Sequence, residues 1–583
     1  MPTLEWIGKD KVVNHHMEVP FRVLERKYSF DENGQHDEDN GSENMIIRGD
    51  NLEALKALLP RYEGRVKCIY IDPPYNTGNE GWVYNDNVND PKIKKWLGEV
   101  VGKEGEDLTR HDKWLCMMYP RLKLLQKLLA DDGVIFISID DTEYANLKLI
   151  CDEIFGSNCF VSNISWQRTY STRNDSKGIV NEVEHLIVYS KLPDWNPNKL
   201  PRTAEMDAKY KNPDNDRTLW RTDNAFAPGA ATHQGMVYAI QHPFTGKMLY
   251  PANGRCWTFG QDQMLEIMRG WCEYEPCDLN DAHERAVVCG VPESDVRQGV
   301  QAIVLSESLE ISAQKAQAVY DRGQWPRFFF TKGGKGGIAR KTYLENVGGK
   351  LPTNFWAFTE TGHTDEAKKE MLAIFDGKAT FDTPKPHRLI EFVLKIAGNE
   401  NALILDSFAG SGTTAHAVLN RNKADGGHRK FILVEMMDYA DSITAERVKR
   451  VICGYGEGKT CVEGTGGNFS FYDLGEPLMH GDVLNENVGV DKIREYVYFT
   501  DTKTPLSEPH PDEPYFMGVH IGSAYYFYYE KQAVTTLNRE FLHTVKTEAD
   551  AYVIYADLCT LSEAELEKYH ITFKKIPRDI TKL

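Results

Sequence analysis

The chain has 583 residues, of which 41% are hydrophobic and 26% are charged, a composition usual for globular proteins. A chain of this length predicts several domains whose cores need no covalent staples, and it contains no apolar run long enough to span a bilayer. The net charge of −18 argues against a uniformly basic surface for nucleic acid, although a local basic cluster is enough for phosphate contact.

The eleven cysteines are scattered, and several stand inside apolar runs such as VKCIY at residues 66–70. This distribution predicts reduced thiols in a cytoplasmic protein, and residues 1–10 lack the basic and apolar regions of a secretory signal. The single set with zinc-ligand residue types is Cys272, Cys277, His283 and Cys289. Its gaps are too irregular for a zinc site, so no metal is expected.

The first α/β region is expected at residues 45–190, after an N-terminal extension at 1–44 whose acidic segment 31–44 predicts a mobile loop. Apolar runs predict strands at 45–48, 66–71, 134–139, 158–167 and 185–190. Leucines at helical spacing predict helices around Leu52–Leu59 and over 113–129.

The section from 191 to 375 is rich in aromatic, Gly, Pro and Asn residues, which predicts a separate domain with a helical insert at 291–322. Segment 321–350 carries seven basic and two acidic residues, which fits either a DNA-contacting surface or a solvated loop face. Several side chains could read bases or merely pack: Arg168, Arg173, Trp220, Arg221, Arg255, Trp257, Trp325 and Arg327.

The α/β pattern returns at residues 376–474, and a C-terminal α+β unit with an aromatic strand at 524–529 is expected at 475–583. In the returning region helices are predicted at 385–396, 412–420 and 445–452, and strands at 402–405 and 430–434. Alternating strands and helices predict a Rossmann-like, doubly wound sheet. Such a sheet binds ligands at the carboxyl ends of its strands, where the strand order reverses.

The sequence DSFAGSGTT at 406–414 follows a predicted strand and begins a predicted helix. Glycines here permit a tight turn and close backbone approach, and the helix N-terminus offers amide donors to an anionic group. Glu435 ends the next strand, where an acid suits the hydroxyls of a ribose. The pattern favours nucleoside binding over a plain strand–helix connection. A P-loop-like stretch at 454–460 is out of register and follows a helix, so no ATP site is expected there.

The sequence Asp72-Pro73-Pro74-Tyr75 follows the strand at 66–71. The exocyclic amine of a nucleobase is a poor nucleophile because its lone pair is delocalised into the ring. An acidic side chain and a backbone carbonyl can accept its hydrogens, two prolines stiffen the loop, and an aromatic ring can stack on a flipped base. The alternative is a rigid turn with a capping aspartate, but placement at a strand end favours catalysis.

Together these motifs resemble the amino-methylating DNA methyltransferases, with the catalytic motif preceding the cofactor motif as in the permuted β group. The fuller pattern resembles the modification (Mod) subunits of type III restriction-modification systems. It comprises IRGDNL (47–52), IDPPYNTG (71–78), TPKPHRLI (383–390) and DSFAGSGTT (406–414). The fold that the resemblance implies is a permuted methyltransferase sheet with an inserted target recognition domain, the section at 191–375.

The resemblance implies S-adenosyl-L-methionine as cofactor and the N6 amine of adenine in double-stranded DNA as target, since cytosine-N4 relatives usually have Ser at the position of Asp72. It assigns catalysis to Asp72, Pro73, Pro74 and Tyr75. It assigns the cofactor to Asp50, Asn51, Lys385, Asp406, Phe408, Gly410, Ser411, Gly412, Thr413 and Glu435, with Lys385 near the cofactor carboxylate. It also implies a homodimer and a separate ATP-dependent restriction subunit. Three alternatives stay open: cytosine-N4 methylation, methylation of RNA or protein, and a catalytically silent nucleic-acid-binding protein.

Overall fold

The computed structural model describes residues 3–77, 95, 110–170, 178–458, 461–506, 510 and 512–578. The chain forms two compact units, which are described separately below. One unit comprises Met1–Asn198 together with Pro352–Leu583, and the other is the central segment Lys199–Leu351. Arg173 and Gly78, both named in the sequence patterns above, lie outside the described residues.

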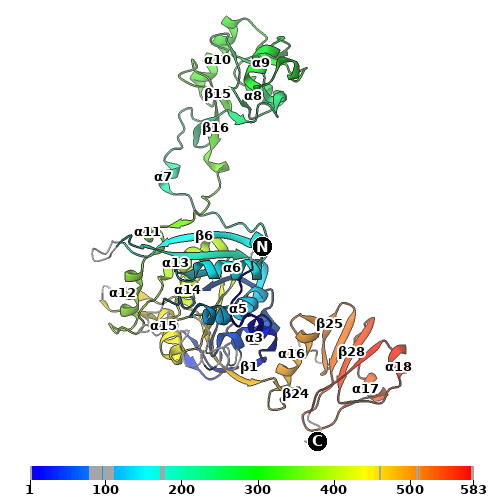
Figure 1. The fold of residues 1–583 in the computed structure, drawn as a ribbon. Coiled ribbons are helices and arrows are strands. Elements are labelled where there is room, and N and C mark those ends of the chain that lie inside the picture. Colours follow the sequence, from blue (N-terminus) through cyan, green and yellow to red (C-terminus); the bar gives the residue numbers. More distant parts are fainter. Residues whose placement is uncertain are drawn as a thin grey trace. The chain divides into compact units, whose positions relative to one another are not determined.

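The first unit is built on a large mixed sheet that, within the described residues, has eleven strands (Figure 1). In sheet order these are β17 (Phe355–Trp356), β6 (Phe160–Gln167), β7 (Val183–Ser190), β5 (Leu129–Ile139), β4 (Val66–Ile71), β18 (Leu403–Asp406), β19 (Lys430–Glu435), β3 (Met45–Arg48), β22 (Phe469–Pro477), β1 (Arg22–Asp31) and β2 (Gly34–His36). From β5 to β22 every neighbouring pair is parallel, whereas β7 runs antiparallel to β5 and β6. The predicted Rossmann-like methyltransferase sheet is confirmed.

Helices cover both faces of this sheet because its strands are apolar on both sides. One face packs against α3 (Asn51–Tyr62), α5 (Arg110–Leu128) and α6 (Tyr144–Phe155), and Ile69 and Ile71 belong to that core. The alternate residues Cys68 and Tyr70 are also buried, on the face that α13 (His387–Ala397) contacts. Beside α13 lies α14 (Thr413–Asp425), which contacts β19.

The strands β4 and β18 are direct neighbours although they come from opposite halves of the chain. They are parallel, with Cys68 opposite Ile404 and Ile69 opposite Leu405. From β18 the chain continues outward to β19, whereas from β4 it continues to β5 on the other side. The strand order therefore reverses between β4 and β18, and the carboxyl ends of these two strands meet at the expected ligand-binding edge.

The N-terminal segment is not a separate extension, which corrects the boundary expected at residue 44. Strand β1 pairs antiparallel with β22, and β2 pairs with β1, so the segment 31–44 includes a strand of the sheet. The physical reason is aromatic packing: the ring of Tyr28 stacks on Phe471, and that of Phe30 stacks on Phe469. The same pairing places β22 across the boundary expected at residue 475.

The central unit is shorter than the expected 191–375. Residues 352–375 belong to the first unit because β17 adds to the edge of the main sheet beside β6. Trp356 is only 1% exposed there and packs against Phe392 of α13. Two helices that follow, α11 (Phe358–Thr361) and α12 (Thr364–Ile374), lie in the same unit.

Within the central unit, three small sheets and the helices α8 (Gln261–Met268) and α10 (Leu309–Arg322) contribute to an aromatic core. The sheet of β15 (Phe328–Phe330), β16 (Ile338–Tyr343) and β8 (Trp220–Asn224) is antiparallel. The helical insert expected at 291–322 is largely wrong: only α10 (Leu309–Arg322) is an α-helix there, and β14 (Ala302–Leu305) precedes it. Three consecutive apolar residues of β14 are buried, a pattern typical of a strand that is covered on both faces: Ala302, Ile303 and Val304.

Several candidate base readers of the central unit are part of its core. Trp220 and Trp257 are 4% and 1% exposed, which supports packing rather than base contact. The buried Lys341 is ion-paired with Asp214 and Asp216, so it contributes nothing to a basic surface. Arg221, Arg255 and Arg327 are exposed.

The C-terminal part contains a four-stranded sheet of β25 (Phe516–His520), β26 (Ser523–Phe527), β28 (Ala551–Ala556) and β30 (Ile571–Lys575) (Figure 1). The last three strands are parallel, with α17 (Arg539–Leu542) and α18 (Glu563–Lys568) in the connections between them. The predicted aromatic strand corresponds to β26. Among the described helices, none combines the length and hydrophobicity needed to cross a membrane.

Candidate active site

The carboxylate of Asp72 lies at the centre of a buried hydrogen-bond cluster at the end of β4. Every β4 residue from Cys68 to Ile71 is buried, so Asp72 emerges at a fixed point and is itself only 9% exposed. The ammonium of Lys385 donates to both oxygens of Asp72, at 2.9 and 2.7 Å, and to the hydroxyl oxygen of Tyr75 at 2.9 Å. The Tyr75 hydroxyl donates in turn to Oδ1 of Asp72, also at 2.9 Å.

Two further charged residues complete this cluster, and the motifs did not reveal one of them. Glu184, at the start of β7, has Oε2 3.2 Å from the Tyr75 hydroxyl and 3.6 Å from Nζ of Lys385. Arg168 donates to Oε1 of Glu184 at 2.7 Å. Glu184 is 6% exposed, and a lone acid beginning an apolar strand was the sole signal available in the sequence.

Opposite charges in this cluster offset the cost of burying it. Burial raises the pKa of Asp72 above its ordinary value, against the opposing effect of the Lys385 ammonium. Burial also acts to lower the pKa of Lys385, but Asp72 and Glu184 outweigh it and raise that pKa. Burial tends to raise the pKa of Glu184, and the cations Lys385 and Arg168 bring it below its usual value.

The loop after Asp72 is held by groups on two helices. The indole of Trp114, on α5, donates to the carbonyl of Pro74 at 2.7 Å. Asn76 has a left-handed backbone (φ 60°), and its side chain donates to the buried carboxylate of Glu143. Glu143 also pairs with the ring of His111 at 2.6 Å. The Pro-Pro turn is therefore preorganised by its neighbours as well as by its own ring constraints.

A glycine elbow, defined here as residues Phe408–Thr413, follows β18. Gly410 and Gly412 have φ values of 52° and 81°, a region that favours glycine. A Cβ added to Gly412 would lie 2.9 Å from the carbonyl oxygen of Thr444, too close for any side chain. The hydroxyl of Thr444 donates to the Gly410 carbonyl at 2.6 Å, which fixes the elbow from the other side.

Two strand-end acids support the elbow. Glu435, at the end of β19, accepts the amide of Gly410 at 2.8 Å and that of Met437 at 3.0 Å. Asp406 accepts the amide of Phe408 at 3.0 Å and the hydroxyl of Thr414 at 2.6 Å. Burial raises the pKa of Asp406 to about 7, and the nearby carboxylates of Asp72 and Glu435 act in the same direction.

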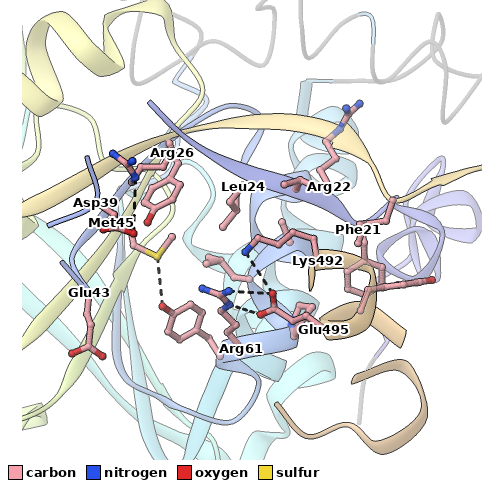
Figure 2. A pocket seen from close by; sticks show the side chains of 18 of the residues that line it. Phe21, Arg22, Leu24, Arg26, Asp39, Glu43, Met45, Arg61, Lys492 and Glu495 are labelled. Atoms are coloured by element: carbon pink, nitrogen blue, oxygen red, sulfur yellow. Dashed lines mark hydrogen bonds and ion pairs between the residues drawn. The ribbon is translucent and has the colours of Figure 1, made fainter. Parts of the chain in front are cut away.

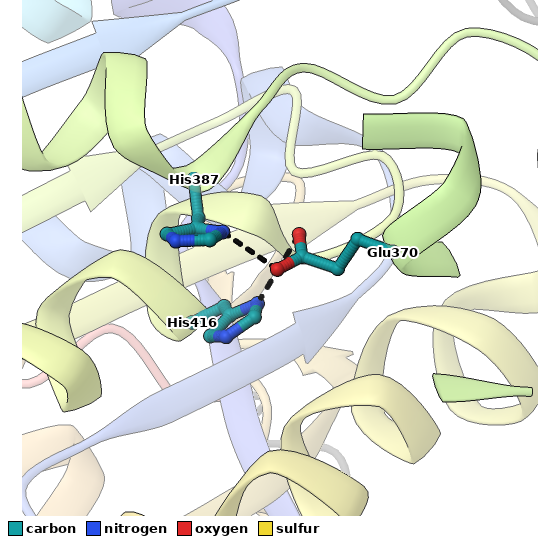
Figure 3. Close-up of side chains that lie close together, drawn as sticks. All are labelled: Glu370, His387 and His416. Carbon is teal, nitrogen blue, oxygen red and sulfur yellow. Dashed lines mark ion pairs between the residues drawn. The ribbon is translucent and has the colours of Figure 1, made fainter. Parts of the chain in front are cut away.

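The buried guanidinium of Arg447, on α15 (Glu446–Cys453), contacts the side chains of the elbow. It donates to the hydroxyl oxygens of Ser411 and Thr413 at 2.9 and 2.8 Å, and to Glu370 at 3.1 Å. Glu370 also pairs with Nδ1 of His387 at 2.7 Å, beside His416 (Figure 3). Burial acts to raise the pKa of Glu370, but the surrounding cationic groups bring it to about 2.

Glu370, His387 and His416 have ligand atoms close enough to hold a metal ion. However, the Arg447 guanidinium contacts both Glu370 and Nδ1 of His416, each at 3.1 Å. A second cation there would be repelled, so the cluster is better explained as support for the elbow.

Asp50 and Asn51 were expected to contact a cofactor, and their side chains already have partners within the fold. Asp50 caps α3 by accepting the amide of Leu52 at 2.8 Å, and it pairs with the buried Arg121 at 3.1 Å. Asn51 donates to the carbonyl of Ser407 at 3.1 Å, which ties α3 to the segment just before the elbow. Their cofactor role stays a prediction.

Asp72 of the catalytic motif and five of the six residues of the glycine elbow line the same pocket. Its walls are formed by Tyr70, Asp72, Phe381, Thr383, Pro384, Lys385, Asp406, Phe408, Ala409, Gly410, Ser411, Thr413 and Thr414. The ammonium of Lys385 contacts Asp72, and the residue lines the pocket together with the elbow. Its expected place near the cofactor carboxylate stays a prediction. The two motifs thus share one cleft at the sheet's reversal point.

A larger cavity of about 510 Å³ lies elsewhere in the first unit, between β1, α3 and α16 (Val490–Thr502) (Figure 2). Its lining includes Met45, the first residue of β3, so part of the cavity lies at the amino end of that strand. Its charged groups are largely paired: Arg61 and Lys492 both contact Glu495. Neither the catalytic motif nor the glycine elbow contributes a residue to this cavity.

The family model described as DNA methylase matches residues 66–446, a span that includes the pocket and both motifs. The chain belongs to this DNA methylase family. The chain is 32% identical over 474 residues to the StyLTI Mod subunit, a type III restriction-modification enzyme of Salmonella typhimurium, covering 77% of this chain and 62% of that one. It is 30% identical to the type II methyltransferase M.KpnI of Klebsiella pneumoniae, covering 68% of this chain and 81% of that one.

The chain spans less than two thirds of the length of these Mod subunits, since the EcoP15I Mod subunit of Escherichia coli is also covered to 64%. Among solved structures, the PvuII cytosine-N4-specific DNA methyltransferase matches with a TM-score of 0.31 at 13% identity, covering 70% of this chain and 86% of that one. The resemblance to DNA methyltransferases expected from the motifs is confirmed at the level of the family.

Proposed function

We propose that this protein transfers a methyl group from S-adenosyl-L-methionine to the N6 amine of adenine in a specific DNA sequence, as a Mod-like modification enzyme. The observation that carries the proposal is the single pocket lined by both Asp72 and the glycine elbow. Methyl transfer requires the acceptor amine and the donor to meet within one cleft, and this pocket provides acidic acceptors at one end and a glycine cradle at the other.

The residues of the elbow fit the proposed cofactor. Gly410 lines the pocket, where it lets a ligand approach the backbone closely, and Gly412 lets the elbow pack against Thr444. The backbone amides at the N-terminus of α14 can donate hydrogen bonds to a carboxylate. Glu435 stands at the adjacent strand end, as expected for a carboxylate that receives ribose hydroxyls. S-adenosyl-L-methionine, when bound, would supply a methyl group on a sulfonium, from which a neutral thioether leaves without further activation. The proton that the amine loses would pass to Asp72 or to water.

The protein's own residues then orient and polarise the target amine. Asp72 is an acceptor for one amine hydrogen. The Pro74 carbonyl is already engaged by Trp114, and no described residue hydrogen-bonds to the carbonyl of Pro73, which can therefore accept the second. Accepting both hydrogens draws the nitrogen lone pair out of the ring and toward the methyl donor. The base must leave the duplex to reach this buried site.

Adenine is favoured over cytosine because the motif residue is Asp72, whereas the resembled cytosine-N4 enzymes usually carry serine there. The central unit, Lys199–Leu351, is the proposed target recognition domain, with the exposed Arg221, Arg255 and Arg327 available for DNA. Similarity to Mod subunits supports a homodimer and a separate ATP-dependent restriction subunit as proposed partners.

The direct test is to incubate the purified protein with labelled S-adenosyl-L-methionine and unmethylated genomic DNA, and to identify the product nucleoside by mass spectrometry. N6-methyladenine is the expected product. N4-methylcytosine would replace the adenine assignment, and label in RNA or protein but not DNA would refute the substrate class. Cofactor binding by calorimetry without any transfer would favour a silent nucleic-acid-binding protein.

A further inference from the structure

Lys385 and Tyr75 already donate to the carboxylate of Asp72, which the proposed function uses as an acceptor for the target amine. The Lys385 ammonium donates to both oxygens of Asp72, while Oδ1 also accepts the Tyr75 hydroxyl. A carboxylate offers about four acceptor sites, so three of those on Asp72 are in use. An incoming amine also needs an N···O separation of about 2.9 Å from these oxygens, which brings it against the Lys385 ammonium.

An amine bound to Asp72 therefore competes with the Lys385 ammonium for these oxygens, and a buried ammonium that loses an acceptor is strongly disfavoured. Glu184 is the second acid within reach, with Oε2 3.6 Å from Nζ. The side chains of Lys385 and Glu184 are 9% and 8% exposed, so water cannot easily substitute for either partner. A lysine side chain has the rotatable bonds needed to cover the remaining distance.

The hydrogen bonds of Glu184 leave room for such an exchange. Its Oε1 is held by Arg168 at 2.7 Å, which fixes the carboxylate in place. Its Oε2 is within 3.2 Å of the Tyr75 hydroxyl, whose single proton also points to Asp72 at 2.9 Å. Because one proton cannot fully serve both carboxylates, Oε2 retains capacity for a stronger donor.

We propose that Glu184 is a positioning residue for methyl transfer: it receives the Lys385 ammonium when the target amine takes over the oxygens of Asp72. This proposal rests on the function proposed above and goes beyond it by assigning Lys385 a movement between two acids. The exchange moves no charge into or out of the site, because Asp72 and Glu184 balance Lys385 and Arg168 before and after it. The energetic cost of opening Asp72 to substrate is thereby kept low.

The test is a double-mutant cycle in the full chain, using Glu184→Gln, Lys385→Met and the combined variant. The matched control is Glu182→Gln, at the residue just before β7. Single-turnover transfer to adenine is measured together with cofactor affinity. Glu184→Gln is expected to slow transfer at least tenfold without weakening cofactor binding, because Lys385 then stays on Asp72. In the Lys385→Met background the same change should alter the rate less than twofold.

The pH profile separates positioning from a structural role. The groups facing Asp72 are Lys385, Glu184, Tyr75, Tyr70 and, at the end of β18, Asp406. Removing the like charge of Glu184 should move the acid limb of the rate profile to lower pH, whereas Lys385→Met should move it to higher pH. Glu184→Asp keeps the negative charge but has a shorter side chain, so its carboxylate lies farther from Lys385. It should slow transfer while shifting the acid limb of the rate profile little.

Should Glu184→Gln fail to fold, Glu184→Asp decides the question. Adenine transfer by the wild-type protein together with wild-type rates in the Glu184 variants would overturn this proposal alone. Equal effects of Glu184→Gln with and without Lys385 would do the same, since the two residues would then act independently. Absence of adenine transfer by the wild-type protein would refute the proposed function, and this proposal with it.

Discussion

Lys385 lies 313 positions after Asp72 in the chain, yet its ammonium donates hydrogen bonds to both oxygens of that carboxylate, at 2.9 and 2.7 Å. The contact exists because β4 and β18 are parallel neighbours, and Lys385 precedes the helix α13 that covers β4. A buried pair of this kind fixes the position of the acid more than it stabilises the fold.

Replacing Asp72 should abolish most transfer without removing the cofactor site. Asp72→Asn retains the size of the side chain but loses the charge that polarises the amine, so we expect a rate loss of roughly 100- to 1000-fold. Cofactor affinity, measured by calorimetry, should stay near the wild-type value because the elbow contacts other groups. The exposed Asp131→Asn is the control, and unchanged turnover in Asp72→Asn would remove Asp72 from its role.

Asp406 should make the folded state sensitive to pH. Its pKa is raised from 3.8 to about 7, so the folded protein holds a proton that the unfolded chain releases. The stability contributed by this group is full below about pH 3.8 and is lost as the pH rises toward 7. Chemical denaturation should show the stability of wild type relative to Asp406→Asn falling by up to about 1.4 kcal/mol per pH unit in this window. A difference in the free energy of unfolding that does not change with pH would contradict the assignment.

Arg447 should affect cofactor affinity through the elbow that it supports. Arg447→Lys keeps the charge but cannot reach Ser411, Thr413 and Glu370 together, because a lysine lacks the planar fork. The loss of one or two hydrogen bonds, each worth about 1 kcal/mol, predicts roughly tenfold weaker cofactor binding. Arg450→Gln on the same helix is the matched control, and equal affinity in both variants would show that the elbow does not need Arg447.

Lys341 should be essential for the stability of the central unit. Lys341→Met leaves Asp214 and Asp216 without their buried cation, a change that typically costs about 3–5 kcal/mol. Limited proteolysis should then cleave within Lys199–Leu351, while calorimetry still detects cofactor binding by the first unit. Lys335→Met removes the same charge from an exposed position and should leave the proteolytic pattern unchanged. Loss of cofactor binding in Lys341→Met would show that the units do not fold independently.

The sequence alone was sufficient to predict where the turns that carry the candidate site residues occur. Asp72 and Glu435 each follow an apolar run of strand length, and Gly410 and Gly412 interrupt a strand–helix junction. These are local signals: backbone geometry at a turn and burial of a short strand depend mainly on neighbouring residues. The Rossmann-like fold followed from the alternation of such elements.

Tertiary structure decided which distant residues meet. Glu184 and Arg447 carry no motif, and Lys385 acquires its partners only because β4, β7 and β18 belong to one sheet. The sequence also misplaced the domain boundaries near β1 and β17. These two segments become strands of the main sheet because β1 pairs with β22 and β17 pairs with β6, which are distant in the chain. Strand pairing and buried charge networks are non-local, because hydrogen bonds and ion pairs form between groups that no sequence window contains together.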